Sequence, residues 1–381
     1  MRTTRIFRSA AVLAVAVLAV AGCGGDDGAD SAKGGDTCGL SIAFFGAQTG
    51  DAANLGINIS NGAQLAVDQY NAKNADCPVT LEKFDSQGSP DQAPALAQRI
   101  IQKTTIVGVV GPTFSGESKV ADPIFNEAGV PLVSASATGP ALSEQSWKVF
   151  HRVVGSDAVQ GPAAAKYIRD TLKAEKVFVV DDASEYGKEL ADILKAELGD
   201  AVVGSDTVQV KQTDFSATVT RIKSSGATVF YFGGYYPEAG LLRKQLTDAG
   251  GKDILLVSDD GVRDAGYVEA AGAEAAEGTV VTCPCVPPDK ASGTFAADYQ
   301  KAFNTAPGTY SAEAYDAATV FLDGIAAGKT TRADLLTWVK SYNKQGITKK
   351  VQFDPKGDVA DKTVWTYVFK NGEIVPDQPV Q

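Results

Sequence analysis

Short apolar runs alternate with amphipathic segments along most of the chain. The runs are rich in β-branched residues, and the segments between them repeat their apolar positions with the period of a helix. Continuous apolar strands that alternate with helices are typical of parallel sheets covered on both faces. Strands are expected at residues 40–45, 79–84, 106–110, 130–134, 176–181, 228–233 and 254–258. Helices are expected at residues 61–71, 93–102, 162–172, 187–198 and 238–249.

This pattern predicts an α/β protein built from two doubly wound units. The first unit extends from residue 40 to about residue 153, and the second from about residue 155 to residue 282. A third region follows, with helices expected at 293–303 and 312–328 and strands at 351–353 and 364–369. Because this region comes after both units, we expect the chain to cross between them more than once.

The N-terminus has the pattern of an export signal. Basic residues precede an apolar run at residues 10–21, which is too short to span a bilayer as a single helix. The run ends in Val20-Ala21-Gly22-Cys23, which resembles a bacterial lipobox, where small residues fit the signal peptidase and the cysteine receives lipid. We therefore expect a signal peptide at 1–22, lipid on Cys23, and a flexible polar tether at 23–38. The alternative is an ordinary signal peptide with a chance cysteine.

The length of the chain and its net charge limit the domains it can form and the partners it can bind. With 381 residues and 44% apolar content, the chain can build a sizeable core in each of two domains. Its 46 acidic side chains exceed its 35 basic ones, which argues against a protein that covers nucleic-acid phosphates or anionic lipid. The lipid anchor would instead hold an exported protein at the outer face of the cell membrane, and we expect it to be a monomer.

Export makes the remaining four cysteines candidates for disulfides, with three possible pairings. Cys38 and Cys77 each stand just before a predicted strand, and if those strands are parallel neighbours their starts lie side by side. We therefore expect a Cys38–Cys77 disulfide. Cys283 and Cys285 are separated by one residue, so a bridge between them would be strained, and two thiols without a nearby histidine do not favour zinc. Their pairing stays open, and we expect no metal site.

The predicted strand ends of the first unit carry small, hydroxyl-rich turns, at residues 111–118 and 135–140. Each turn leads into a helix, where backbone N–H groups and hydroxyls can converge on a carboxylate. The first turn spells G-x-x-x-x-G-E-S, which is close to a phosphate-binding loop, but Glu117 stands where the loop requires lysine. No G-x-G-x-x-G follows any predicted strand either. We therefore expect no nucleotide or other cofactor.

The predicted strand ends of the second unit are aromatic and acidic, at residues 181–187, 233–238 and 258–261. Tyrosine rings supply rigid apolar area with a polar tip, and a carboxylate at a cleft edge can hold an ammonium group. The first unit thus has groups that can bind an anion, and the second unit has groups that can bind a cation. That division suits a zwitterionic ligand.

Three blocks of sequence connect these features to a known family: residues 161–168 (GPAAAKYI), 231–238 (YFGGYYPE) and 353–358 (FDPKGD). Between about residue 40 and about residue 375, the chain resembles the type I periplasmic binding proteins of the branched-chain amino-acid (Leu/Ile/Val) transport family. In that family, two doubly wound lobes joined by three hinge crossings close over one amino acid. The protein then delivers it to the membrane permease of an ABC importer.

The resemblance also implies lobe boundaries and site residues. Lobe 1 would comprise residues 39–154 and 284–349, and lobe 2 residues 155–283 and 350–381. Residues of the first lobe that match the family motif would contact the α-carboxylate and ammonium of the ligand: Ser115, Ser136 and Thr138. From the second lobe, Tyr186 and Tyr235 would close over the ligand, and Asp260 would pair with its ammonium.

Two departures from the family pattern bear on ligand identity. The family acid is commonly glutamate, so Asp260 reaches about one methylene less far, and Leu55 replaces an aromatic residue of close relatives. We expect Leu55 and Phe114 to line the side-chain pocket. Each site residue also has a plainer alternative, because the hydroxyls could cap helices, the tyrosines could pack in the core, and Asp260 could be a turn residue.

Catalysis is not expected. His151 is the only histidine and lies in a strand-like segment entering the first crossing, where a buried or hinge-lining ring is favoured over a catalytic base. No G-x-S-x-G elbow appears. The adjacent acids at 181–182 and 259–260 lie in loops, where neighbouring side chains point different ways. The remaining alternative keeps the fold and makes the protein a lipid-anchored sensor for amides or aromatic amino acids.

Overall fold

Four parallel strands form the first sheet. The computed structural model describes residues 38–380 and places these strands in the order β2-β1-β3-β4. All neighbours in this sheet pair in parallel, as the alternation of strands and helices predicts. The strands are β1 (Ser41–Gly46), β2 (Thr80–Asp85), β3 (Ile106–Val110) and β4 (Leu132–Val133).

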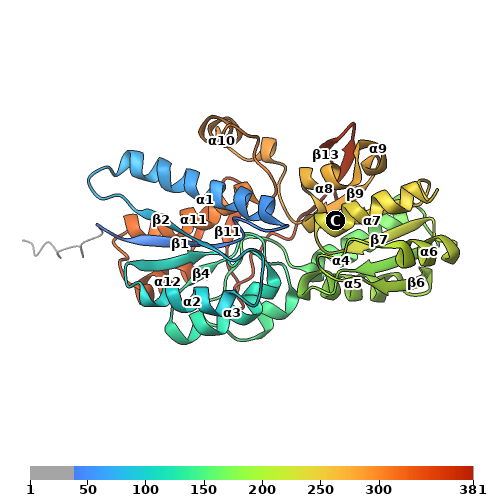
Figure 1. Cartoon of the computed structure of the whole chain (residues 1–381). Helices are drawn as coiled ribbons and strands as arrows, with labels where there is room; N and C mark the ends of the chain where they lie inside the picture. The colour runs from blue at the N-terminus through green and yellow to red at the C-terminus, as the bar shows by residue number, and fades with distance from the viewer. Residues whose placement is uncertain (1–37, 381) are drawn as a thin grey trace, which may run out of the picture. The chain divides into compact units, whose positions relative to one another are not determined.

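Helices from two distant parts of the chain surround this sheet. The earlier ones are α1 (Ala53–Lys73), α2 (Ala93–Gln102), α3 (Ser115–Ala128) and the 3-10 helix η1 (Pro140–Glu144). The later ones are α11 (Ser311–Ala326), α12 (Arg332–Ser341) and α10 (Phe295–Phe303), which packs on α1 rather than on the strands. Helix α11 lies along α1 (Figure 1), and a Cβ atom at Gly62 would sit 1.9 Å from the carbonyl oxygen of Ser311. Glycine therefore permits the close approach of these two helices.

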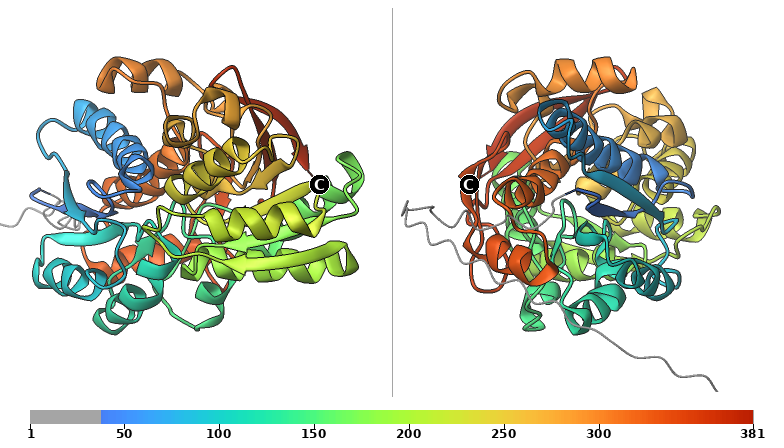
Figure 2. Two further views of the ribbon diagram at one scale, coloured as in Figure 1. Left: turned by 45° about the vertical axis from the view of Figure 1, so that its right-hand side comes forward. Right: turned by 90° about the vertical axis from the view of Figure 1, so that its left-hand side faces the viewer.

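The second sheet has seven strands in the order β13-β12-β9-β8-β7-β5-β6. Strands β6, β5, β7, β8 and β9 are parallel, whereas β12 and β13 form an antiparallel hairpin added to the β9 edge. The red hairpin of Figure 2 thus joins a sheet formed by much earlier residues. The strands are β5 (Val177–Asp181), β6 (Val202–Thr207), β7 (Val229–Gly233), β8 (Leu255–Ser258), β9 (Val280–Cys283), β12 (Val364–Lys370) and β13 (Glu373–Val380).

Helical segments precede, connect and follow the parallel strands of this second sheet. The α-helices are α4 (Asp157–Lys166), α5 (Glu185–Leu198), α6 (Ser216–Ser225), α7 (Tyr236–Asp248), α8 (Ala265–Ala271) and α9 (Ala273–Ala276). The shorter turns are η2 (Tyr167–Thr171), η3 (Gly199–Ala201), η4 (Asp260–Val262) and η5 (Pro288–Lys290). A separate two-stranded ladder pairs β10 (Asn343–Gln345) with β11 (Lys350–Gln352).

The strand order of both sheets reverses at a defined point. In the first sheet β1 lies between β2 and β3, and in the second β5 lies between β6 and β7. Chains leave such neighbouring strands toward opposite faces, which opens a crevice at the carboxyl ends of the strands. The residues that follow β1, β3, β5 and β7 are therefore placed to meet a ligand.

The predicted α/β architecture is confirmed, and every predicted strand and helix is present. The boundaries differ in places, since α1 begins at Ala53 rather than residue 61. Strands β6, β9, β10 and β13 were not predicted. Strands β6 and β13 are edge strands with exposed positions, and β13 contains Pro376 and Pro379, residues that disfavour a central strand. Strand β9 is a buried run of 4 residues, and β10 is an exposed one of 3.

Two disulfides are present in the described residues. Cys38 is bonded to Cys77 with a Cα–Cα distance of 4.6 Å, at the starts of the parallel neighbours β1 and β2. Cys283 is bonded to Cys285 across Pro284. The second bond settles the pairing that the sequence left open.

The expected signal peptide, the expected lipidation site Cys23 and nearly all of the expected tether lie outside the described residues. Among the helices of residues 38–380, none combines the length and the apolar character needed to cross a membrane.

Candidate ligand-binding site

A small cavity lies where strand ends from both sheets meet. Its volume is about 20 Å³, so the side chains around it lie close together. Seven of the residues singled out from the sequence line it: Leu55, Phe114, Ser115, Ser136, Tyr186, Tyr235 and Asp260. Four further residues complete the lining: Ile59, Thr113, Gly261 and Tyr310.

The hydroxyl side of the cavity is built from two loops of the first sheet. The Ser136 hydroxyl donates to the carbonyl oxygen of Thr113 at 2.6 Å, which ties the loop after β4 to the loop after β3. The Ser115 hydroxyl oxygen accepts the N–H of Gly139 at 3.1 Å. Helix α3 begins at Ser115, and Phe114, not a hydroxyl residue, is its N-cap. These two serines therefore connect loops at the cavity wall and do not serve as helix caps.

Thr138 is not among the residues that line the cavity. Its side chain is fully buried, and its carbonyl oxygen accepts the N–H of Asp157 at 3.0 Å. The carbonyls on either side of it, those of Ala137 and Gly139, accept from the guanidinium of Arg152 at 3.2 and 2.9 Å. The structure thus sets Thr138 behind the wall, against the start of α4, rather than beside Ser136.

The aromatic side of the cavity comes from the second sheet. Tyr186 follows β5 and donates its hydroxyl to Oδ1 of Asp260 at 2.8 Å, while its oxygen accepts the N–H of Gly261 at 3.3 Å. The ring of Tyr235 lies 5.3 Å from that of Tyr186 and 5.2 Å from that of Phe114. Because Phe114 follows a strand of the first sheet, this edge-to-face pair bridges the two sheets' loops across the cavity.

Asp259 and Asp260, which follow β8, make different hydrogen bonds. Asp259 accepts the N–H of Gly234 at 3.1 Å and so supports the loop after β7. Asp260 accepts from Tyr186 and lines the cavity. The Tyr186 hydroxyl favours the charged form of both acids, so the two carboxylates lie close together although they support different loops.

The cavity is surrounded by an excess of buried acid. Burial raises the pKa of Asp260, of Asp259 and of Asp157, and the carboxyl of Asp260 raises the pKa of the other two further by repulsion. None of the side chains that line the described cavity is cationic. Carboxylates in such surroundings favour either a bound proton or a cationic ligand group.

Sequence reasoning did not single out the lining residues Ile59, Thr113, Gly261 and Tyr310, nor Asp157, which adjoins the acid cluster without lining the cavity. Asp157 and Tyr310 are the two of these that act on the buried acids. Asp157 begins α4 and reaches the acid cluster from the first crossing, and the hydroxyl of Thr138 favours its charged form. Tyr310 precedes α11, and its hydroxyl favours the charged form of Asp260. Neither residue follows a strand of the expected sheets, so the strand-end argument could not find them. A positive φ of 63° at Tyr310 is visible only in the structure.

His151 lies away from the cavity. Its ring is buried, its Nδ1 lies 3.0 Å from the carbonyl oxygen of Val149, and it packs edge-on against Phe353 at 5.0 Å. Burial lowers the pKa of His151 to about 4, so the imidazole is neutral at physiological pH.

A model of the periplasmic binding proteins matches residues 39–373, nearly the whole described chain. This chain belongs to the periplasmic binding protein family. Its fold is the type I form, and the family consists of solute-binding proteins.

Named relatives of this periplasmic binding protein agree with that assignment. The Leu/Ile/Val-binding protein BraC3 of Rhizobium johnstonii is 34% identical over 344 residues, which cover 88% of this chain and 93% of the relative. The substrate-binding protein LivJ of Streptococcus pneumoniae, solved with isoleucine, superposes with a TM-score of 0.83 at 27% identity, covering 89% of this chain and 98% of that one. A solute-binding protein of R. palustris, solved with benzoate, has a TM-score of 0.80 at 19% identity, covering 90% and 96%, and shares the fold.

The acid in the G-x-x-x-x-G-E-S turn of this binding protein has a structural role. Glu117 is fully buried in α3, and its Oε2 accepts the N–H of Phe114 at 3.3 Å, which fixes the turn that carries Phe114 and Ser115 into the cavity. Burial raises the pKa of Glu117 to about 7 from an ordinary value of 4.5. The side chain that stands in place of a phosphate-binding lysine thus supports the cavity wall.

This buried acid predicts a pH-dependent stability. Because the pKa of Glu117 is about 7 in the folded protein and 4.5 in the unfolded chain, folding favours the protonated carboxyl. The contribution of this group to the free energy of unfolding is therefore complete below pH 4.5 and is lost as the pH rises through about 7. Glu117→Gln keeps the acceptor for the Phe114 N–H but carries no charge. We expect the variant to gain roughly 3 kcal/mol of unfolding free energy relative to the wild type between pH 5 and pH 8.

Urea unfolding of both proteins at pH 5 and pH 8 measures this gain. Glu127→Gln, at an exposed position of the same helix, is the matched control and should show no such change. An equal pH dependence for Glu117→Gln and the wild type would contradict the prediction.

Proposed function

We propose that this protein is the extracytoplasmic solute-binding subunit of an ABC importer, and that it closes around a small amino acid with a Leu-, Ile- or Val-like side chain. The observation that carries the proposal is the composition of one cavity. Leu55, Ile59 and Phe114 supply apolar surface there, and Asp260 supplies a buried carboxylate. The relatives named for Leu/Ile/Val or solved with isoleucine support this ligand class.

In this proposal the ligand ammonium pairs with Asp260. The carboxylate is buried, and the neighbouring Asp157 adds negative potential that a cation relieves. A ligand without an amine, such as benzoate, would bring a second anion into this cluster. The acid excess therefore supports an amino acid rather than an aromatic carboxylate.

The ligand carboxylate faces the loops of the first lobe in this proposal. Ser115 and Ser136 line the cavity, and Ser115 stands at the N-terminus of α3, where free N–H groups favour an anion. Thr138 acts on the ligand only through Asp157, because it does not line the cavity. Tyr186 and Tyr235 then close over the ligand from the second lobe.

We propose that binding occurs by rotation of lobe 1 (39–154 and 284–349) against lobe 2 (155–283 and 350–381), and that the ligand shifts the population toward the closed form. Direct contacts between the lobes support the closed form as well. Asn54 donates to Asp264 at 2.9 Å, and the Tyr236 hydroxyl donates to the carbonyl oxygen of Asp51 at 2.7 Å.

We also propose that lipid on Cys23 anchors the protein at the outer face of the cell membrane. The apolar run, the lipobox-like residues 20–23 and the polar stretch after them support this part. A lipid-anchored monomer on a short tether would hold captured ligand at high local concentration near the permease. No catalytic step forms part of the proposal.

Titration calorimetry tests the proposed ligand class. The chain without residues 1–23 would be titrated with the twenty amino acids, with small amides and with benzoate. We expect heat of binding with leucine, isoleucine and valine and none with benzoate. Binding of amides or aromatic amino acids alone would favour the sensor alternative, and binding of no solute would contradict the transport role.

A further inference from the structure

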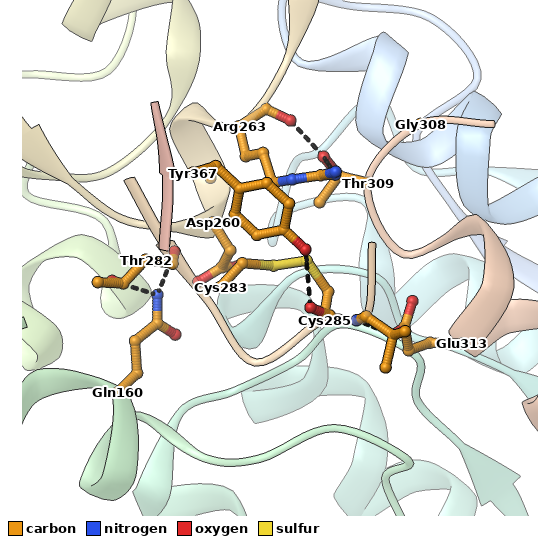
Figure 3. The surroundings of a disulfide bond; sticks show 12 residues. Gln160, Asp260, Arg263, Thr282, Cys283, Cys285, Gly308, Thr309, Glu313 and Tyr367 are labelled. Carbon is orange, nitrogen blue, oxygen red and sulfur yellow. Dashed lines mark hydrogen bonds between the residues drawn. A yellow bond between two sulfur atoms is a disulfide. The ribbon is translucent and has the colours of Figure 1, made fainter. Parts of the chain in front are cut away.

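The Cys283–Cys285 disulfide lies where the chain leaves the second sheet. Cys283 is the last residue of β9, and α10, which follows, packs beside α1 of the first lobe. Both cysteines are buried, with exposed fractions of 0% and 1%. The bond therefore sits inside the segment that crosses between the lobes (Figure 3).

Contacts from three directions meet at this bond. The Tyr367 hydroxyl, from β12, donates to the carbonyl oxygen of Cys285 at 2.9 Å. Just after the bond, the N–H of Val286 donates to Oε1 of Glu313 in α11 at 2.8 Å. A Cβ atom at Gly155, in the first crossing, would lie 3.3 Å from Cβ of Pro284. The bond thus touches the second lobe, the first lobe and another crossing at once.

A chain of contacts leads from the bond to the ligand cavity. The guanidinium of Arg263 lies 4.0 Å from the centre of the Tyr367 ring, and its Nη1 donates to the Thr309 hydroxyl at 2.9 Å. Arg263 ends the short turn that begins at Asp260, and Thr309 precedes Tyr310. Figure 3 shows Tyr367 between the disulfide and this Arg263–Thr309 pair. Two residues of the cavity, one from each lobe, are therefore fixed close to the bond.

The number of residues that each disulfide encloses indicates whether its main effect is on stability or on positioning. A disulfide stabilises a fold by restricting the unfolded chain, and this effect grows with the number of residues it encloses. Cys283 and Cys285 are 2 positions apart, whereas Cys38 and Cys77 are 39 apart. The short bond therefore contributes little through the unfolded chain, and its main effect is to restrict the backbone of the crossing.

We infer that the Cys283–Cys285 disulfide positions the ligand site by holding the second lobe crossing rigid, so that closure brings Asp260 and Tyr310 together. This inference rests on the proposed function. Without the bond, the crossing samples more conformations, and a smaller fraction of molecules has a binding-competent site. Apparent affinity falls in proportion to that fraction.

Two double variants test the inference. Cys283→Ser with Cys285→Ser removes the bond of the crossing, and Cys38→Ala with Cys77→Ala removes the remote bond as a matched control. We expect the first variant to bind leucine about five-fold more weakly or worse, with the Leu, Ile and Val preference order unchanged. The control should keep wild-type affinity although it loses more thermal stability.

A second measurement tests the inference in case the Cys283→Ser, Cys285→Ser variant folds poorly. The control variant without residues 1–23 retains only the Cys283–Cys285 disulfide. Refolding it with dithiothreitol reduces this bond to two Cys thiols, and dithiothreitol is oxidised to its cyclic disulfide. Alkylation and mass measurement count the thiols. The reduced protein should show the same weakened leucine binding as the serine variant.

The outcomes separate the two claims. If the wild type binds leucine and either bond-free form binds it equally well, the inference is wrong and the proposed function stands. If neither form without the bond folds, the bond serves stability and the inference is also wrong. If the wild type binds no amino acid, the proposed function itself falls.

Discussion

Asp260→Ala is expected to weaken leucine binding by roughly a thousand-fold, about 4 kcal/mol. The carboxylate is 4% exposed and accepts a 2.8 Å hydrogen bond from Tyr186, so it is both desolvated and oriented before the ligand arrives. Removing one partner of a buried ion pair leaves the other without compensation, and this costs several kcal/mol. Calorimetry with leucine measures the loss directly.

A ligand analogue separates the role of Asp260 from general damage to the site. 4-Methylpentanoate has the carbon skeleton and carboxylate of leucine but no amine, so the acid cluster should make its binding to the wild type weak. Because Asp260→Ala removes one of the repelling carboxylates, the affinity for 4-methylpentanoate should not fall in the variant. Asp253→Ala, at an exposed position, should leave both affinities unchanged. Equal losses for leucine and for 4-methylpentanoate would remove Asp260 from the ammonium site.

Arg152→Met is expected to lower the free energy of unfolding by about 4 kcal/mol. The Arg152 side chain is fully buried, and its Nε lies 2.6 Å from Oδ1 of Asp358. It also donates to the backbone of Ala137 and Gly139 and to the hydroxyl of Ser143. Methionine fills similar volume but leaves these acceptors without a donor.

Urea unfolding at pH 7 measures this loss. Lys356→Met is the matched control, because Lys356 pairs with Glu144 at 2.7 Å with side chains 56% and 61% exposed, and exposed pairs contribute at most about 1 kcal/mol. A loss for Arg152→Met no larger than that of the control would show that water replaces the guanidinium.

The sequence predicts the sheets well because buried parallel strands must be apolar on both faces. The runs at β3 and β7 are buried throughout, so their composition alone identifies them. Edge strand β6 alternates half-buried with exposed positions and carries no such signal. Periodicity likewise predicted residues 61–71 of α1 but not its start, where Leu55 and Ile59 line the cavity.

The sequence placed residues at the cavity where they lie in the turn or helix start after a buried strand. Ser115, Tyr186 and Asp260 lie at such positions, and all three line the cavity. Thr138 stands in the same kind of turn, but Arg152 binds the carbonyls beside it and turns it to the back of the wall. Such a choice depends on a partner from another loop, which no local pattern contains.

Tyr310 shows a second reason for failure. It comes to the cavity from the part of the chain that returns to the first lobe after β9. Its neighbours in sequence form a helix, not a strand end, so its position depends on how α11 docks against α1. Long-range docking of this kind is specified by packing and not by local sequence.

The close packing of α11 on α1 also has a consequence for the order of folding during export. A chain that emerges from its N-terminus presents β1 to β4 long before α11, yet Phe321 of α11 covers Gly108 of β3, where a Cβ atom would lie 2.5 Å from its ring. Strands β5 to β9 are contiguous, so this parallel part of the second sheet can form before α11 emerges, and only its β12–β13 hairpin comes later. The first sheet therefore keeps an exposed apolar surface for longer during translocation than the parallel part of the second sheet does.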